Sequence, residues 1–255
     1  ILGATGTLQN ASQVLTPEQL QRFEKAKTTF DKPVIIVTQK EAEKAEKTKS
    51  KEKKTWTFKA ENVRDVAFAT SRKFIWDAMA VDINGKTPLA MSYYPKEGNP
   101  LWEKESTRAV ANTLITYSKH TIDYPYPKAI SVHAASIGME YPMICFNFGR
   151  PDPDGSYTDQ KKWGMIGVIV HEVGHNFCPM IINSDERQWT WMDEGLNTFV
   201  QSLTQKEHYP DMPIRRGCAA CIVDYMKGDK EGIRPIMTNS EQILQQCLRK
   251  AGRSA

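Results

Sequence analysis

Hydrophobic side chains in the first part of the chain occur in short β-branched runs or at a spacing of two. Pro33 to Thr38 is such a run, and Thr55 to Lys59 places Trp56 and Phe58 on one face. Both segments are therefore predicted to be strands. Between them, Lys40 to Lys54 carries seven lysines against four glutamates, which favours a solvated helix or loop over contact with nucleic acid or a membrane.

Two apolar runs further along predict a β-hairpin. Phe74–Val81 and Ala90–Tyr94 suit two strands, and Asn84-Gly85 between them favours a tight turn. Ile130 to Ala134 alternates in the same way, and the apolar run Met143 to Phe148 follows it. The loop Gly149 to Lys162, rich in Asp, Pro and Gly, then leads into the next helical segment.

The spacing changes to that of a helix after Asn99. Pro100 can occupy the first helical position with Asn99 as the cap. The apolar stripe consists of Trp102, Ala109, Val110, Leu114 and Tyr117. This stripe is expected to pack in the core rather than to bind a cofactor.

Composition and charge indicate an ordinary globular protein. The chain has 255 residues, 40% of them hydrophobic and 25% charged, with a net charge of +4. This is enough for one sizeable domain, or for a domain and part of another. The longest apolar run, Met165 to Val170, contains Gly167 and is too short to cross a bilayer. The chain opens on Ile1 without a signal-peptide pattern, so we expect an excerpt of a longer protein, and its localisation stays open.

The five cysteines do not predict a disulfide framework. They are Cys145, Cys178, Cys218, Cys221 and Cys247, an odd number without regular spacing. Cys218 and Cys221 form a lone CxxC pair. Without a second pair or nearby histidines, this pair is weak evidence for structural zinc or redox chemistry.

Candidate chemistry is concentrated between Trp163 and Phe199. His171 and His175 are four residues apart, so on a helix they present two imidazole nitrogens to one point. Glu172 can reach a metal-bound water without being a ligand itself. Eighteen residues separate His175 from Glu194, enough to end the first helix, turn, and return on a second helix that begins near Glu194.

The residues after Glu194 support that second helix. Leu196, Phe199, Val200 and Leu203 form an amphipathic run, so Glu194 is expected in the first turn as the third ligand of one Zn²⁺ ion. The remaining histidines, His120, His133 and His208, are expected to be structural.

These motifs resemble those of a known family. The segment His171-Glu172-Val173-Gly174-His175, followed by 18 residues and by Glu194 within Trp-Met-Asp-Glu-Gly, is similar to the zinc signature of the aminopeptidase N family of gluzincin metallopeptidases. Gly138-Met139-Glu140-Tyr141 resembles the exopeptidase motif Gly-x-Met-Glu-Asn of that family, with Tyr141 in place of Asn. The resemblance extends from about Trp56 to about Gln245.

The resemblance implies an α+β fold. Residues 66–245 would form a thermolysin-like catalytic domain with a mixed sheet and zinc-binding helices. Residues 1–65 would be the C-terminal remnant of an N-terminal β-saddle domain, and residues 246–255 an atypical tail.

It also implies a zinc-dependent aminopeptidase acting on peptides with a free N-terminus. Glu172 would be the general base, and Gly138, Met139, Glu140 and Tyr141 would bind substrate. Glu140 would pair with the α-ammonium group. No nucleic-acid partner and no membrane span are expected. Relatives of this kind are often exported, but any signal would lie upstream of Ile1.

The chain departs from the family in one respect. The family stabilises its transition state with a tyrosine in a Tyr-x-Lys-Gly or Tyr-x-Lys-Pro context. Tyr225 has the local context but follows Glu194 by only 31 residues, and Tyr209 is a weaker candidate. A frameshift offers another explanation, because Cys247 to Gly252 can be encoded by a shifted reading of codons for Ala-Tyr-Gly-Lys-Pro-Ala. Sequencing reads of the coding DNA would test this.

Two other functions therefore stay open. One is a zinc-binding but catalytically silent domain, which predicts bound metal without turnover. The other is a thermolysin-like endopeptidase, which shares the zinc site but does not need Glu140.

Overall fold

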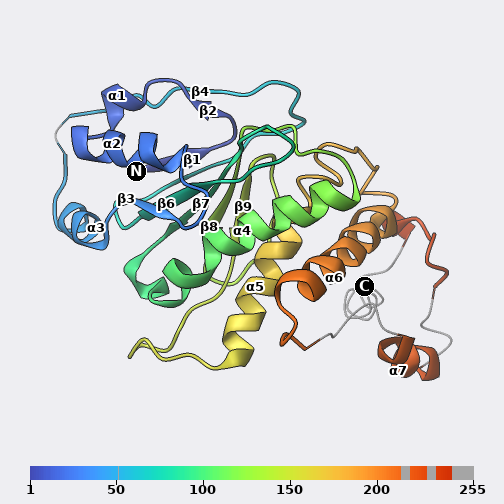
Figure 1. Ribbon diagram of the computed structural model, residues 1–255. Helices are drawn as coiled ribbons and strands as arrows, with labels where there is room; N and C mark the ends of the chain where they lie inside the picture. Colours follow the sequence, from blue (N-terminus) through green and yellow to red (C-terminus); the bar gives the residue numbers. More distant parts are fainter. Residues whose placement is uncertain (51, 214–218, 229–233, 243–255) are drawn as a thin grey trace.

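A mixed five-stranded sheet forms the centre of the molecule (Figure 1). The computed structural model describes residues 1–50, 52–213, 219–228 and 234–242. In spatial order the strands are β3 (Val34–Val37), β6 (Ile75–Ala80), β7 (Leu89–Tyr94), β8 (Lys128–His133) and β9 (Ile144–Asn147). The pairs β3–β6 and β6–β7 are antiparallel, whereas β7–β8 and β8–β9 are parallel. The predicted α+β class with a mixed sheet is confirmed.

The predicted hairpin is β6–β7. Ile75 pairs with Tyr94 and Ala80 with Leu89, so the register covers both strands in full. In the turn, Asn84 and Gly85 have φ angles of 50° and 84°. Two successive positive φ angles give a turn whose twist matches that of the strands, and this explains the Asn-Gly pair.

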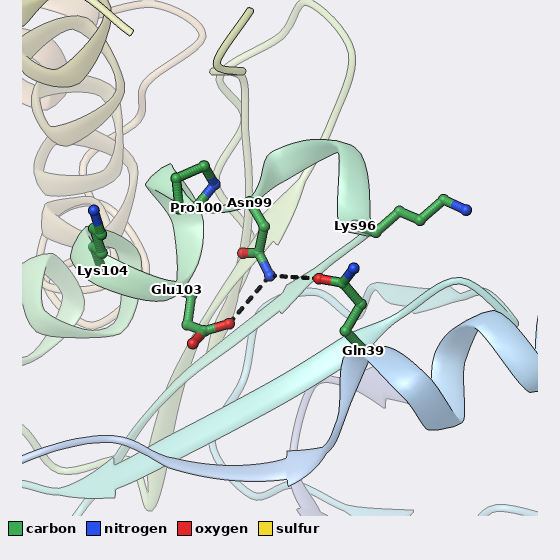
Figure 2. Close-up of a pocket in the computed structure, with 6 residues that line it drawn as sticks. All are labelled: Gln39, Lys96, Asn99, Pro100, Glu103 and Lys104. Atoms are coloured by element: carbon green, nitrogen blue, oxygen red, sulfur yellow. Dashed lines mark hydrogen bonds between the residues drawn. The ribbon is translucent and has the colours of Figure 1, made fainter. Parts of the chain in front are cut away.

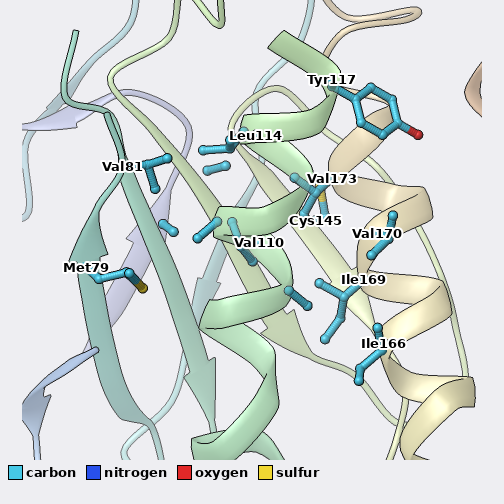
Figure 3. Packing of buried hydrophobic residues seen from close by; sticks show 14 of the residues in the cluster. Met79, Val81, Val110, Leu114, Tyr117, Cys145, Ile166, Ile169, Val170 and Val173 are labelled. Carbon is cyan, nitrogen blue, oxygen red and sulfur yellow. The ribbon is translucent and has the colours of Figure 1, made fainter. Parts of the chain in front are cut away.

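Helices cover both faces of the sheet. On one face lie α4 (Leu101–His120), α5 (Asp159–Gly174) and α6 (Leu196–His208), which pack on one another. Ile75 and Met79 of β6 point to this side, where Val110, Leu114 and Ile169 complete the core (Figure 3). Trp76, Ala78 and Ala80 alternate to the other face. There they share a second core with α1 (Ala11–Val14) and α2 (Pro17–Ala26).

Two small antiparallel sheets join the N-terminus to residues 58–70. Strand β1 (Leu2–Ala4) pairs with β5 (Phe68–Thr70), and β2 (Thr7–Leu8) pairs with β4 (Phe58–Lys59). The predicted strand at 55–59 is thus shorter than expected. Because β3 belongs to the central sheet, residues on both sides of position 65 share that sheet. The proposed division into domains at this position stays a prediction.

The charged segment that follows β3 begins as a helix. Helix α3 (Gln39–Glu46) starts with a capping box, in which Thr38 accepts from the backbone of Glu41 and the Glu41 side chain accepts from the backbone of Thr38. Only Ala42 of this helix is buried. The prediction of a solvated helix holds for this part of the segment.

The start of α4 differs from the prediction. The helix begins at Leu101, Pro100 occupies the capping position, and no side chain caps the helix. Asn99 instead donates from its amide to Gln39 and to Glu103, each at 3.1 Å, in an open pocket beside α3 (Figure 2). The predicted cap was wrong: Pro100 stands between Asn99 and the first helical residue, and the side-chain oxygen of Asn99 accepts no hydrogen bond from the backbone of the first turn.

A chain of buried polar side chains lies between α4 and the sheet. Asp77 of β6 accepts hydrogen bonds from Tyr94, at 2.6 Å, and from Thr107. From Thr107 the chain continues through Ser92, Ser106 and Ser131 to Asn147. Burial raises the pKa of Asp77 to about 7, against the effect of its two hydroxyl donors.

Among the described residues, none of the helices combines the length and the apolar character that crossing a bilayer requires.

Candidate metal centre

Helix α5 presents the first two candidate ligands. It is capped by Thr158, whose side chain accepts from the backbone N–H of Lys161, and it ends at Gly174, so that His175 is the residue directly after its last turn. Because the backbone N–H of His175 still bonds to the carbonyl of His171 at 3.2 Å, the two residues stay on one side of the helix. Their Nε2 atoms lie 3.2 Å apart.

The third candidate ligand, Glu194, belongs to a different helical segment from the two histidines. It lies in a π-helical turn, Trp191–Gly195, which leads directly into α6. Its Oε2 atom is 3.0 Å from His171 Nε2 and 3.8 Å from His175 Nε2. The structure therefore brings His171, His175 and Glu194 together, as the 18-residue spacing predicts, although the turn is wider than an α-helical one.

The arrangement of these three donor atoms suits a zinc ion. Tetrahedral ligands about 2.1 Å from zinc stand roughly 3.4 Å from one another, close to the separations of 3.0, 3.2 and 3.8 Å found here. Two imidazoles and one carboxylate are also a common catalytic ligand set for zinc. Protons on the imidazoles can join these atoms as hydrogen bonds, and a metal ion can take the place of those protons. The donor set and its spacing therefore fit the metal that the motif implies.

Each histidine is held through its other ring nitrogen. His171 Nδ1 lies 3.0 Å from Gln201 Oε1, and the amide of Gln201 is itself oriented by donating to the carbonyl of Gly167. His175 Nδ1 lies 2.9 Å from the carbonyl oxygen of Cys178 and 2.8 Å from Asp193 Oδ1. These contacts hold Nδ1–H as the donor and leave Nε2 free to bind a metal.

The sequence motifs alone do not point to these supporting residues. Gln201 follows Glu194 by seven residues, two helical turns, so the spacing was a usable signal. Asp193 stands beside Glu194 in the motif itself. Asn197, one turn after Glu194, donates to the carbonyl of His171 and accepts from the hydroxyl of Tyr117, which joins α4, α5 and α6 behind the site.

The surroundings shift the pKa values of Glu172 and His175, two buried ionisable groups of the site. Burial raises the pKa of Glu172 to about 7, while His171 and His175 act in the opposite direction. Burial alone lowers the pKa of His175, but the hydrogen bond and charge of Asp193, with Glu140 and Glu194, outweigh it and raise that pKa to about 10.

The segment Gly138 to Tyr141 lies along the edge of the sheet beside the metal centre. Met139 exchanges two backbone hydrogen bonds with Phe146 of β9, at 3.0 and 2.8 Å. One carboxylate oxygen of Glu140 lies within 4.8 Å of ligand atoms of His175 and Asp193. The ring of Tyr141 packs edge-on against Phe146. The structure thus places the segment next to Glu172 and His175.

Gly138 contacts the general-base candidate directly. A Cβ atom at this position would lie 2.3 Å from Glu172 Oε1 and 2.9 Å from Val168 Cγ2. Only a residue without a side chain leaves the carboxylate in its present place. This is a physical reason for glycine at the start of the motif.

Other candidates lie outside the centre. His120 pairs with Glu207, His133 accepts from Arg150, and His208 bonds to Thr116, so all three have structural contacts elsewhere. Tyr209 bonds to Asn112 at 3.0 Å. Tyr225 lies in α7 (Val223–Lys227), drawn apart from α5 and α6 in Figure 1. Cys218 and the tail at 246–255 lie outside the described residues.

Comparison with known proteins gives a partial likeness. No protein-family model matches the chain, and no curated protein matches it. An M1 zinc metallopeptidase from Deinococcus radiodurans is 15% identical, with a TM-score of 0.40, over 56% of this chain and 29% of its own length. Legionella pneumophila aminopeptidase A, solved with aspartic acid, is 13% identical with a TM-score of 0.42, over 56% of this chain and 17% of its own.

The chain spans less than a third of the length of these structures. They are zinc metallopeptidases and aminopeptidases, but at such low identity the functional argument rests on the side chains described above.

Proposed function

We propose that this chain carries the catalytic centre of a zinc-dependent aminopeptidase, which removes N-terminal residues from peptides. The observation that carries the proposal is the convergence of His171, His175 and Glu194 within 4.8 Å of one another. Glu172 stands beside these donors, and Glu140 approaches them from the sheet edge.

The chemistry divides between the ion and the side chains. When bound, zinc supplies a Lewis acid that polarises the scissile carbonyl and lowers the pKa of water. His171, His175 and Glu194 would hold it, and three protein ligands leave a position for water. Glu172 accepts a proton from the attacking water on its carboxylate and delivers it to the nitrogen of the leaving amine. With its pKa raised to about 7 by burial, this carboxyl group is suited to both transfers near neutral pH.

Glu140 supports the choice of an aminopeptidase. A carboxylate beside the metal centre attracts the α-ammonium group of a peptide, and such charge-assisted pairing places the scissile bond one residue from the chain end. The backbone of Gly138 to Tyr141 continues the sheet edge and offers a place for an extended substrate.

One observation favours the silent zinc-binding alternative. Among the described tyrosines, Tyr209 is engaged with Asn112 and Tyr225 lies in α7. Loss of one transition-state donor lowers turnover by roughly 10²–10³-fold in other enzymes. Bound metal with very slow turnover is therefore the second candidate.

Arylamide release by the purified, zinc-loaded chain tests these functions. The substrates are a free aminoacyl arylamide and its N-acetyl twin, and the control is Glu172→Gln. Release from the free form alone, abolished by Glu172→Gln, supports the aminopeptidase. Equal cleavage of internal bonds in blocked peptides indicates an endopeptidase, and stoichiometric zinc without release indicates the silent domain.

A further inference from the structure

The π-helical turn Trp191–Gly195 directs two consecutive carboxylates to opposite sides of one imidazole. Asp193 Oδ1 lies 2.8 Å from Nδ1 of His175, whereas Glu194 Oε2 lies 3.8 Å from Nε2 of the same ring. Neighbouring side chains on a regular helix point about 100° apart. Single π-turns are rare and occur often at functional sites, and this one brings Asp193 and Glu194 to the same histidine.

The contact between Asp193 and His175 is buried. Their side chains are 8% and 2% exposed, respectively. A charged pair interacts more strongly in such surroundings than in water, because little solvent screens it. The carbonyl of Cys178 also lies within hydrogen-bond distance of Nδ1, so an oxygen without a net charge would already hold the proton there.

The two candidate histidine ligands are therefore supported unequally. His171 has a neutral partner, the amide oxygen of Gln201 at 3.0 Å. His175 has a carbonyl and, in addition, the full negative charge of Asp193. Because the carbonyl can select the tautomer on its own, what Asp193 adds is charge.

We infer that Asp193 is a positioning residue for the metal, acting through His175. The carbonyl of Cys178 accepts from Nδ1–H, and the negative charge of Asp193 beside the same nitrogen increases the donor strength of Nε2 toward the ion. This inference rests on the proposed function, since it presumes a metal at His171, His175 and Glu194. It assigns tight metal binding to a residue that is not itself a ligand.

Metal affinity, measured on the full chain by competition with a chelator for Zn²⁺, tests the inference. Asp193→Asn keeps an acceptor oxygen and removes only the charge, and Asp193→Ala removes both. Asp185→Asn is the matched control. It is the same substitution in the loop before the π-turn, at a carboxylate that accepts hydrogen bonds from Gln188 and not from a candidate ligand. We expect both Asp193 variants to bind zinc 10- to 100-fold more weakly and the control to bind as the wild type does.

Two further readouts separate positioning from folding. The absorption spectrum of bound Co²⁺ reports the ligand field and is expected to change in both Asp193 variants but not in Asp185→Asn. Thermal unfolding of the metal-free proteins shows whether each variant folds.

The outcomes are distinct. Wild-type affinity and an unchanged Co²⁺ spectrum in Asp193→Asn would overturn the charge role, even if Asp193→Ala were weakened. A wild-type chain that binds no zinc would overturn both the inference and the proposed function. Zinc binding that depends on Asp193, without any peptidase activity, would support the inference and leave only the proposed function refuted.

Discussion

Replacing Gly138 by alanine should displace the carboxylate of Glu172, the proposed general base, while leaving the candidate metal ligands in place. The new Cβ would lie 2.3 Å from Glu172 Oε1, 3.0 Å from Glu172 Cδ and 2.9 Å from Val168 Cγ2. Ordinary contacts begin at about 3.4 Å, so the carboxylate must retreat by about 1 Å. Gly138 has no positive φ angle that would strain an alanine backbone. The expected damage is therefore local to Glu172.

A displacement of about 1 Å in a reacting group can cost roughly 10²-fold in rate. We expect kcat/KM for an aminoacyl arylamide to fall by about that factor in Gly138→Ala, with zinc content and thermal stability close to those of the wild type. The measurement combines initial rates, metal analysis and thermal unfolding.

Gly164→Ala is the matched control. Gly164 lies on α5, the same helix as Glu172, and a Cβ there meets nothing within 4 Å. Alanine should keep full activity and stabilise the helix by roughly 0.5–1 kcal/mol. Activity of Gly138→Ala within about threefold of the wild type, or an equal loss in both variants, would show that the contact with Glu172 does not position the base.

Two further predictions concern stability. Gly174→Ala would place a Cβ 2.2 Å from Asn197 Oδ1 and 2.3 Å from the hydroxyl oxygen of Tyr117, so we expect a loss of roughly 1–3 kcal/mol in urea unfolding; unchanged stability would mean that the three helices can separate freely there. Asp77 has a folded-state pKa of about 7, above its ordinary value of 3.8, so its contribution is full below about pH 4 and is lost as the pH rises through 7. The shift corresponds to at most about 4 kcal/mol. Asp77→Asn should remove this decline in the unfolding free energy between pH 4 and 8, and a decline of the same size in the variant would exclude Asp77 as its source.

The convergence of the three candidate ligands could be predicted because its signals are local. Four residues separate His171 from His175 on one helix, and the apolar run after Glu194 marks the helix that returns. Both features depend on the local sequence and not on how the distant elements of the fold are placed. The hairpin is a similar case, since Asn84-Gly85 determines a turn over two residues.

The support around the centre could not be predicted in the same way. Whether Asp193 reaches His175 depends on the π-turn, and a hydrophobic pattern does not distinguish that turn from an α-helical one. Tyr117 was expected only as part of an apolar stripe, yet its hydroxyl donates to Asn197 at 2.7 Å. Asn99 follows the rules for a helix cap, but the helix starts one residue later than the pattern predicts, and the amide of Asn99 bonds to Gln39 and Glu103. Such contacts depend on the relative placement of distant elements.

The chain of buried hydroxyl groups between α4 and the sheet also has an order of donors and acceptors. Thr107 has one hydroxyl hydrogen but lies within bonding distance of both Asp77 and Ser92. The Thr107 hydroxyl is placed to donate to either of them, Ser106 donates to Ser131, and between Ser92 and Ser106 either hydroxyl can be the donor. Asn147 also donates to Ser131.

An ionised Asp77 takes the Thr107 hydrogen for itself, whereas a proton on its Oδ1 atom leaves that hydrogen for Ser92. Ser92 then donates to Ser106 and Ser106 to Ser131, so the last hydroxyl hydrogen, on Ser131, needs an acceptor outside this group of hydroxyls. The hydroxyls therefore do not orient independently, because the charge on Asp77 selects the acceptor of Thr107 and, through Ser92, the donor in the next bond. Removing a single hydroxyl, as in Ser106→Ala, would divide the chain into two parts whose polarities no longer depend on each other.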